Sequence, residues 1–318
     1  MKKPVKIQYE PMQAKTILNP VKAPSMPFDW SINPYRGCQH GCSFCYARST
    51  HSFLGVEADD TFQRHIFLKQ SAPDILREQL RKRMRSRKAA ELGQIAIGTA
   101  TDPYQQIEAK ALLTRGCLEV LAEFQAPVTI TTRSPLILRD LDLLKTLKHV
   151  SVNISVSTLN NTVWKQFEPS TPSPAQRLRT VRELNEAGIP TGIFAAPILP
   201  HITDGEADLS ELIQAAADAG SRFVMPSYLR LSTREVKVWF FQTLRQHYPQ
   251  LAGVYADMYH ASSSTPAHYK APKMKLIDQL LQKHSTLQRS YHPADAAQKE
   301  PARTISIETS EPVQLTLF

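Results

Sequence analysis

Six short β-like runs, each followed by a helical pattern, constrain the fold of this chain more than any other feature. The runs lie at residues 30–33, 94–99, 127–132, 150–157, 191–199 and 222–227. Strands that alternate with helices in this way form a parallel sheet built from βα units, so the predicted fold class is α/β. Two of the intervening helices have readable ends. One should begin at Ser173 and stop at Gly188, and the other should begin at Asp204 and stop near Gly220.

The run at 150–157 indicates a sheet with one polar face. Its valine and isoleucine residues alternate with Ser151, Asn153, Ser155 and Ser157. Strands of an open parallel sheet are covered on both faces and are usually apolar throughout, whereas a barrel around a polar cavity produces this alternation. Ligands of βα barrels bind at the carboxyl ends of the strands. The candidate residues at such ends are Thr101, Asp102, Arg133, Ser157, Pro197 and Ser227, and helix-capping loop residues are the alternative for any one of them.

Length and composition are those of a globular protein. The chain has 318 residues, a mass of 35.8 kDa and 42% hydrophobic residues. We expect an N-terminal extension at 1–27, a barrel at 28–260, a helical segment at 261–284 and a flexible polar tail at 285–318. No stretch reaches the roughly 18 apolar residues of a membrane span, so we expect a cytoplasmic protein with no membrane partner.

The formal charge of +9 favours a polyanionic partner, although charge alone does not identify one. The densest basic run, 81–88, belongs to a predicted helix with a capping box at Ser71 and Asp74. Its predicted buried side consists of Leu76, Leu80 and Met84. The basic side is either a solvated helix face or a phosphate-binding face.

Three of the four cysteines, Cys38, Cys42 and Cys45, lie within eight residues. Such crowding in a reducing compartment indicates metal or redox chemistry more than disulfides. Structural zinc needs four ligands and would have to recruit His40, His51 or a distant residue, whereas a 4Fe-4S cluster with three cysteine ligands leaves one iron open. The fourth cysteine, Cys117, falls on the apolar stripe of a predicted helix and should be a packed thiol.

The spacing C-x3-C-x2-C, with aromatic Phe44 before the last cysteine, resembles the radical S-adenosylmethionine (SAM) superfamily. Longer stretches resemble its spore photoproduct lyase-like, or DNA repair photolyase, branch over residues 28–250, especially uncharacterised relatives that share TDPYQ-x-I-E. These stretches are NPYRGCQHGCSFCYAR, GTATDPYQQIE, ITTRSPLILRDLDLL, FEPSTPSPAQRL and AAPILP. The resemblance implies a partial (β/α)6 barrel in which the three cysteines bind a 4Fe-4S cluster. It also implies S-adenosylmethionine as the second cofactor and an electron donor such as flavodoxin or ferredoxin.

Positions that match the branch carry implied roles. Arg133 replaces a lysine that would meet the cofactor carboxylate, Ser157 matches a serine that contacts the ribose, and Ala196 matches a backbone contact to adenine. Thr101 stands where the branch has a hydroxyl residue near the cofactor. The implied cofactor-binding set is Phe44, Thr101, Asp102, Arg133, Ser157 and Ala196.

Tyr46 matches a tyrosine beside the last cysteine and is the implied catalytic residue. Glu108 and Arg177 also match family positions, with a buried salt bridge as the structural alternative for both. One residue departs from the pattern: spore photoproduct lyase has a hydrogen-donor cysteine where this chain has Thr99. A threonine hydroxyl is a poor hydrogen-atom donor, so the same relay for thymine-dimer reversal is not expected.

The last five residues, QLTLF, resemble the peptide that binds the bacterial sliding clamp, with Gln314, Leu315, Leu317 and Phe318 as the contact residues. An apolar chain end that docks on its own domain is the alternative. A clamp partner would favour DNA as the substrate.

Three functional hypotheses follow from these patterns. The first is a radical SAM enzyme that acts on nucleic acid, in the manner of DNA repair. The second is the same chemistry on a protein, a transfer RNA or a small molecule. The third is a nucleic-acid-binding module with a structural metal.

Overall fold

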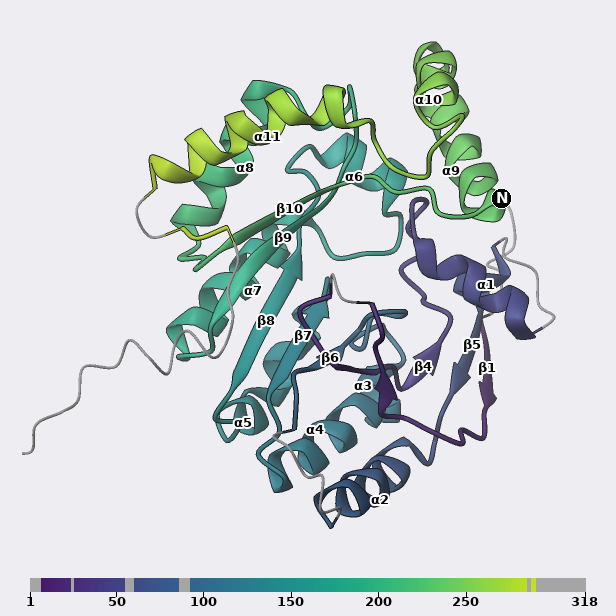
Figure 1. The fold of residues 1–318 in the computed structure, drawn as a ribbon, viewed down its shortest axis with the longest axis vertical. Helices are drawn as coiled ribbons and strands as arrows, with labels where there is room; N and C mark the ends of the chain where they lie inside the picture. The colour runs from purple at the N-terminus through teal and green to yellow at the C-terminus, as the bar shows by residue number, and fades with distance from the viewer. Residues whose placement is uncertain (1–6, 24–25, 55–59, 86–91, 285–286, 290–318) are drawn as a thin grey trace, which may run out of the picture.

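The large sheet is a partial barrel of parallel strands (Figure 1). The computed structural model describes residues 7–23, 26–54, 60–85, 92–284 and 287–289. All six predicted strands are present and pair in chain order, and a short strand joins β3 in antiparallel orientation. The strands are β2 (Asn19–Pro20), β3 (Trp30–Ile32), β6 (Ile95–Ile97), β7 (Val128–Thr132), β8 (Val150–Ser155), β9 (Thr191–Ile198) and β10 (Val224–Tyr228). The α/β prediction is confirmed.

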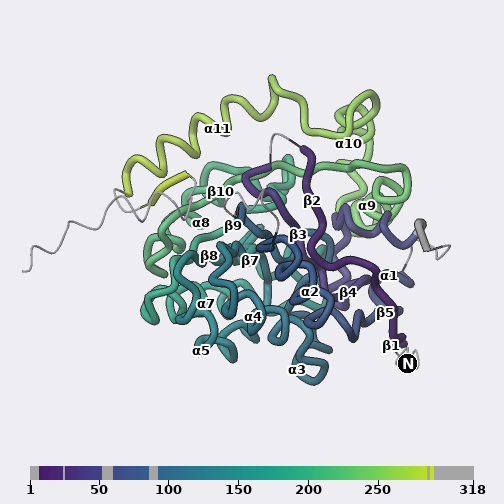
Figure 2. Tube along the Cα trace, turned by 60° about the horizontal axis from the view of Figure 1, so that its bottom comes forward, coloured from purple at the N-terminus to yellow at the C-terminus, as the bar shows by residue number. Residues whose placement is uncertain are grey.

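Helices pack on the outer side of this sheet, and the chain returns through them from one strand to the next (Figures 1 and 2). The α-helices are α1 (Thr61–Arg64), α2 (Ala72–Met84), α3 (Glu108–Ala111), α4 (Leu113–Glu123), α5 (Leu141–Leu144), α6 (Asn161–Phe167), α7 (Pro174–Glu186), α8 (Glu206–Asp218), α9 (Arg234–His247), α10 (Ala252–Met258) and α11 (Ala267–Gln282). Three 3-10 helices complete them: η1 (Tyr46–Leu54), η2 (Pro135–Asp140) and η3 (Pro249–Leu251). No helix in the described part of the chain has both the length and the hydrophobicity that a membrane span requires.

A second, smaller sheet lies beside the first strands of the barrel (Figure 1). It consists of β1 (Gln8–Pro11), β5 (His65–Leu68) and β4 (Tyr35–Arg36), in the order β1-β5-β4. Because β1 belongs to this sheet and β2 to the barrel, the segment before residue 28 connects the two sheets. The barrel boundary at residue 28 stays a prediction. The predicted clamp-binding peptide at 314–318 lies outside the described residues.

The helix ends follow the sequence signals in part. At the start of α7 the Ser173 hydroxyl accepts from the Gln176 amide and the Gln176 side chain accepts from the Ser173 amide, which forms a capping box and confirms the predicted start of this helix. The helix α8 begins after Gly205 and not at Asp204. Asp204 instead accepts hydrogen bonds from the His201 amide at 2.8 Å and the Tyr269 hydroxyl at 2.8 Å, which fix the preceding loop.

Two predictions for α2 are wrong. Ser71 is the N-cap residue, but its side chain makes no capping hydrogen bond. Met84 is 55% exposed, whereas Leu76 and Leu80 are buried as predicted. Met84 is the last residue of α2, one turn beyond Leu80, the last buried residue of the helix.

The two faces of the central strands differ in chemistry. On the inner face Thr129 lies 3.0 Å from Ser151, oxygen to oxygen, and the Asn153 amide donates to the Thr131 hydroxyl at 3.2 Å. The outer face is apolar and belongs to the main hydrophobic core, which also contains the fully buried Cys117 of α4. This arrangement confirms the polar inner face and the packed thiol.

Candidate active site

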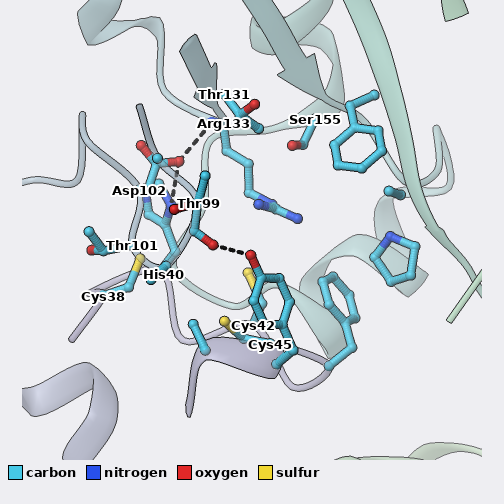
Figure 3. Close-up of a pocket in the computed structure, with 18 of the residues that line it drawn as sticks. Cys38, His40, Cys42, Cys45, Thr99, Thr101, Asp102, Thr131, Arg133 and Ser155 are labelled. Carbon is cyan, nitrogen blue, oxygen red and sulfur yellow. Dashed lines mark hydrogen bonds and ion pairs between the residues drawn. The ribbon is translucent and has the colours of Figure 1, made fainter. Parts of the chain in front are cut away.

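A cavity of about 210 Å³ lies at the carboxyl ends of the barrel strands (Figure 3). Thr101 and Asp102 reach it after β6, Arg133 follows β7, and Pro197 and Ser227 come from β9 and β10. Five of the six strand-end residues selected from the sequence therefore line the same cavity. This is the end of a βα barrel at which ligands bind.

The loop with the three cysteines leaves β4 directly. Gly37 has a φ of +78°, and a Cβ atom at this position would lie 2.6 Å from the carbonyl oxygen of His65, so glycine is required here. Cys38, Cys42 and Cys45 are free thiols that all line the cavity. The short spacing and the glycine turn thus bring three sulfur ligands to one wall.

The charged groups around the sulfurs favour a negatively charged ligand set. Burial raises the pKa values of Cys42 and Cys45, and the nearby Arg133 guanidinium partly counteracts this effect for both thiols. Burial would also raise the pKa of Cys38, but the adjacent His40 lowers it below the ordinary value. Metal ligation requires thiolates, so His40 and Arg133 favour the form of the cysteines that binds a cluster.

Asp102 is the hydrogen-bond centre of the part of the wall next to Cys38 and His40. Its Oδ1 accepts from the Thr132 hydroxyl at 2.6 Å and from the Tyr104 amide at 2.9 Å, and its Oδ2 accepts from the Arg133 amide at 2.8 Å. The His40 Nδ1 lies 3.3 Å from Oδ2. Burial acts to raise the pKa of Asp102, but His40 and these donors lower it to about 2, so the carboxylate is ionised at neutral pH.

Arg133 extends from this carboxylate to a second one. Its guanidinium carbon lies 5.9 Å from the centroid of the Phe44 ring, and its Nε lies 3.4 Å from Oε2 of Glu168. Glu168 is 1% exposed, and its Oε2 accepts from Arg177 at 2.5 Å. The Ser157 hydroxyl donates to its Oε1 at 2.5 Å. Glu168 therefore holds Arg133, a cation that lies near Cys42 and Cys45 and lines the cavity.

The donor set fits an iron-sulfur cluster better than a single ion. Among the described residues, no group of three or more His, Cys, Asp or Glu side chains is arranged to hold one metal ion. Structural zinc needs four ligands that converge on one point. Three thiols along one wall, with cations nearby and open volume beside them, instead match a cluster that is held from one side and accessible from the other.

A sequence model of the Radical SAM superfamily matches residues 32–213. The chain belongs to this superfamily. An uncharacterised protein from Mycobacterium tuberculosis (strain H37Rv) is 31% identical over 318 residues, which cover 98% of this chain and 88% of that protein. An uncharacterised protein from Methanocaldococcus jannaschii is 29% identical over 246 residues, which cover 77% of this chain and 85% of that protein.

The fold of this radical SAM enzyme is similar to that of spore photoproduct lyase. A solved variant of that lyase with bound AdoMet and dinucleoside spore photoproduct has a TM-score of 0.66 and 17% identity, with 88% of this chain and 81% of that chain covered. A second variant gives a TM-score of 0.65 and 18% identity, with 88% of this chain and 80% of that chain covered. The likeness supports the partial radical SAM barrel as the fold.

Most of the site residues predicted for this radical SAM enzyme lie together. The cavity is lined by Cys38, Cys42, Phe44, Cys45, Tyr46, Thr101, Asp102, Arg133 and Ala196. The exception is Ser157, which is buried and donates to Glu168, while Ser155 two residues earlier lines the cavity. The roles of these residues toward the cofactors stay predictions.

Two buried residues near the cysteines, His40 and Glu168, are not among the predicted cofactor-binding residues. His40 was considered only as a zinc ligand, yet it lies between Cys38 and Asp102. Glu168 falls in the FEP stretch but received no role, although it joins Arg133 to Arg177. Arg177 makes an ion pair with Glu168 at 2.5 Å, and Glu108 makes one with Arg139 at 2.9 Å. A buried salt bridge was the structural alternative for both Arg177 and Glu108.

Proposed function

We propose that this radical SAM enzyme binds a 4Fe-4S cluster through Cys38, Cys42 and Cys45 and acts on nucleic acid. The observation that carries the proposal is the single cavity that contains three free thiols beside the Arg133 guanidinium. When bound, the cluster and S-adenosylmethionine supply the reductive cleavage that yields methionine and a 5'-deoxyadenosyl radical. The protein contributes the position of the reactants and the exclusion of water.

Each side chain has a proposed task in that positioning. Arg133 would bind the cofactor carboxylate, and its guanidinium can do so with two parallel hydrogen bonds. Asp102 holds the Arg133 backbone amide at 2.8 Å, and Glu168 lies 3.4 Å from the Arg133 Nε, so both carboxylates support this residue from behind. Phe44 stacks near the same guanidinium. Ala196 and Ser155 would face the nucleoside part of the cofactor.

Tyr46 and Thr99 flank the space in which the substrate would react. The Tyr46 hydroxyl donates to the Thr99 carbonyl oxygen, and both residues line the cavity. We propose that Tyr46 is the residue that contacts the reacting groups. Thr99 offers no thiol, so the hydrogen-atom relay of spore photoproduct lyase is not proposed for this chain.

Two observations favour nucleic acid as the substrate class. The chain carries a formal charge of +9, which suits a polyanion. The similar lyase structure is described with a bound dinucleoside photoproduct. A DNA substrate would also agree with the predicted clamp peptide at 314–318.

The test is anaerobic. The cluster is reconstituted and reduced, and 5'-deoxyadenosine is quantified with irradiated duplex DNA, with intact duplex DNA and with no DNA. A yield that rises with either DNA supports a nucleic-acid substrate, and a larger rise with irradiated DNA supports repair. Equal yields in all three samples would refute the nucleic-acid substrate while leaving the radical chemistry intact.

A further inference from the structure

A second cavity, of about 470 Å³, lies beside the first at the carboxyl ends of β3 and β6. We call it the Lys69 cavity. Its wall includes Lys15 and Asn19 from the N-terminal segment, Asn33 after β3, Arg36 of β4, Lys69 after β5, and Ala100. The two sheets and the segment that connects them therefore all contribute to it.

Positive charge in the Lys69 cavity is not balanced by the protein around it. Lys15, Arg36 and Lys69 line it, and no Asp or Glu does among the described residues. The Lys69 Nζ donates to the Asn33 carbonyl oxygen at 2.7 Å, and the Arg36 Nη1 donates to the Thr50 carbonyl oxygen at 3.5 Å. These acceptors are neutral. Across the described ranges, none of the three cations has a carboxylate oxygen within 4.0 Å.

The pKa of Lys69 is consistent with the unbalanced positive charge in the cavity. Burial lowers its pKa, the positive charge of Arg36 lowers it further, and the resulting value is about 8. Two cations near each other in a partly buried space repel, and an anion between them would relieve that repulsion. Lysine and arginine together are the usual protein partners of a phosphate group.

The Lys69 cavity and the cysteine cavity share a wall. Ala100 lines both. Asn33 holds this wall, because its Nδ2 donates to the Thr99 hydroxyl at 2.9 Å and its Oδ1 accepts from the Ala100 amide at 2.8 Å. The loop around Ala100 therefore borders both cavities, and groups bound in the two cavities would be neighbours. One nucleotide and the phosphate next to it are adjacent groups of this kind.

We propose that the Lys69 cavity binds a backbone phosphate of a nucleic-acid strand whose reacting nucleotide occupies the cysteine cavity. This inference rests on the nucleic-acid substrate proposed above. A free phosphate has the same chemistry, but the shared wall and the charge of the whole chain favour the phosphodiester of a strand. Phosphate contacts of this type fix register and orientation, while other groups select the base.

The experiment measures binding of a labelled single-stranded oligonucleotide to the cluster-loaded protein between 50 and 200 mM salt. The variants are Lys69→Gln and Lys15→Gln. The matched control is Lys148→Gln, since Lys148 is exposed and lies just before β8, at the opposite end of the barrel. We expect each cavity variant to bind about 5- to 10-fold more weakly and the slope of log K against log salt to fall by about 0.7. The control should change affinity less than about twofold.

Several outcomes would overturn the inference. One is an unchanged affinity and salt slope in both cavity variants. Another is that inorganic phosphate binds the wild type and the oligonucleotide binds the wild type and all variants with equal affinity. The cavity would then bind a small oxyanion and not a nucleic-acid strand. Unchanged iron content and far-ultraviolet circular dichroism confirm that the variants are folded. If Lys69→Gln does not fold, Lys15→Gln still tests the inference, because Lys15 is exposed.

The inference and the proposed function fail in different ways. If DNA raises the 5'-deoxyadenosine yield equally in the wild type and in Lys69→Gln, the substrate class stands and the phosphate site does not. If the oligonucleotide binds through the Lys69 cavity but no DNA raises the yield, the substrate proposal fails, and the site no longer has the reacting nucleotide that the inference requires.

Discussion

Replacing Glu168 with glutamine should reveal how strongly the carboxylate behind Arg133 stabilises the fold. Glu168 and Arg177 are each 1% exposed, and their charged atoms lie 2.5 Å apart. The glutamine has nearly the same shape but no charge. The variant therefore leaves Arg177 buried without an ionic partner at this position.

The magnitude follows from the pKa of Glu168. Burial alone would raise it, but Arg177 and Arg133 lower it from 4.5 to about 2. A difference of about 2.5 pKa units corresponds to about 3 kcal/mol of folding free energy at neutral pH. This is at the lower end of the roughly 3–5 kcal/mol expected when one partner of a buried ion pair is removed.

The sign of the pH dependence is fixed by the direction of the shift. A carboxyl group with a lowered folded-state pKa contributes its full stabilisation above pH 4.5 and loses it as the pH falls toward 2. At pH 3.5 the wild type should have lost about 1 kcal/mol of this contribution. Glu168→Gln should lack this loss, so the difference in stability between the two proteins should shrink in acid.

Urea unfolding followed by tryptophan fluorescence at pH 7 and at pH 3.5 measures both quantities. The control is Glu119→Gln. The Glu119 side chain is 51% exposed and lies 3.5 Å from Arg115, so this substitution should lower the free energy of unfolding by less than about 1 kcal/mol. A loss below about 1 kcal/mol for Glu168→Gln at pH 7, or a gap that stays constant between the two pH values, would refute the reasoning.

Three further predictions concern the cofactors and the tail. Cys42→Ala should lose iron and sulfide, measured by chemical analysis and visible absorbance, whereas Cys117→Ala should keep the cluster and lose about 1–2 kcal/mol of stability, since Cys117 is fully buried in the core. A full cluster in Cys42→Ala would contradict the ligand assignment. Arg133→Ala should weaken S-adenosylmethionine binding at least about tenfold by calorimetry, because a charge-assisted hydrogen bond is lost. The control is Arg179→Ala, since Arg179 of α7 is exposed and does not line the cavity. Deletion of residues 314–318 should abolish binding to a bacterial sliding clamp in a pull-down and leave the iron content unchanged, and clamp binding by the truncated protein would rule out the peptide.

Local patterns predicted much of the fold. The alternation in 150–157 indicated the polar inner face, and the Ser173 and Gln176 pair marked the start of α7, because both signals act over a few residues. The strand β1 was not predicted. All four of its residues are exposed, so it has no apolar pattern, and its partner β5 lies more than 50 residues further along the chain.

The candidate site shows the same division. The sequence predicts the three cysteines from their spacing, and it predicts Arg133 and Asp102 from their places at the ends of strands. The sequence does not predict the link from Arg133 through Glu168 to Arg177, because these residues lie in three separate segments that only the tertiary structure brings together. Ser157 does not line the cavity for a related reason: it is the last polar residue of its run, and beyond the end of β8 its hydroxyl donates to Glu168.

Hydrogen-bonded polar side chains link β7 and β8 inside the barrel. Thr129 is bonded to Ser151 and Thr131 to Asn153, so these groups satisfy part of one another's hydrogen-bonding capacity. A highly reactive intermediate formed above them would meet side chains below it and the cysteine loop beside it. Exchange of substrate, product and solvent would then be confined to the mouth of the barrel, where the composition of the loops and not of the strands sets what enters.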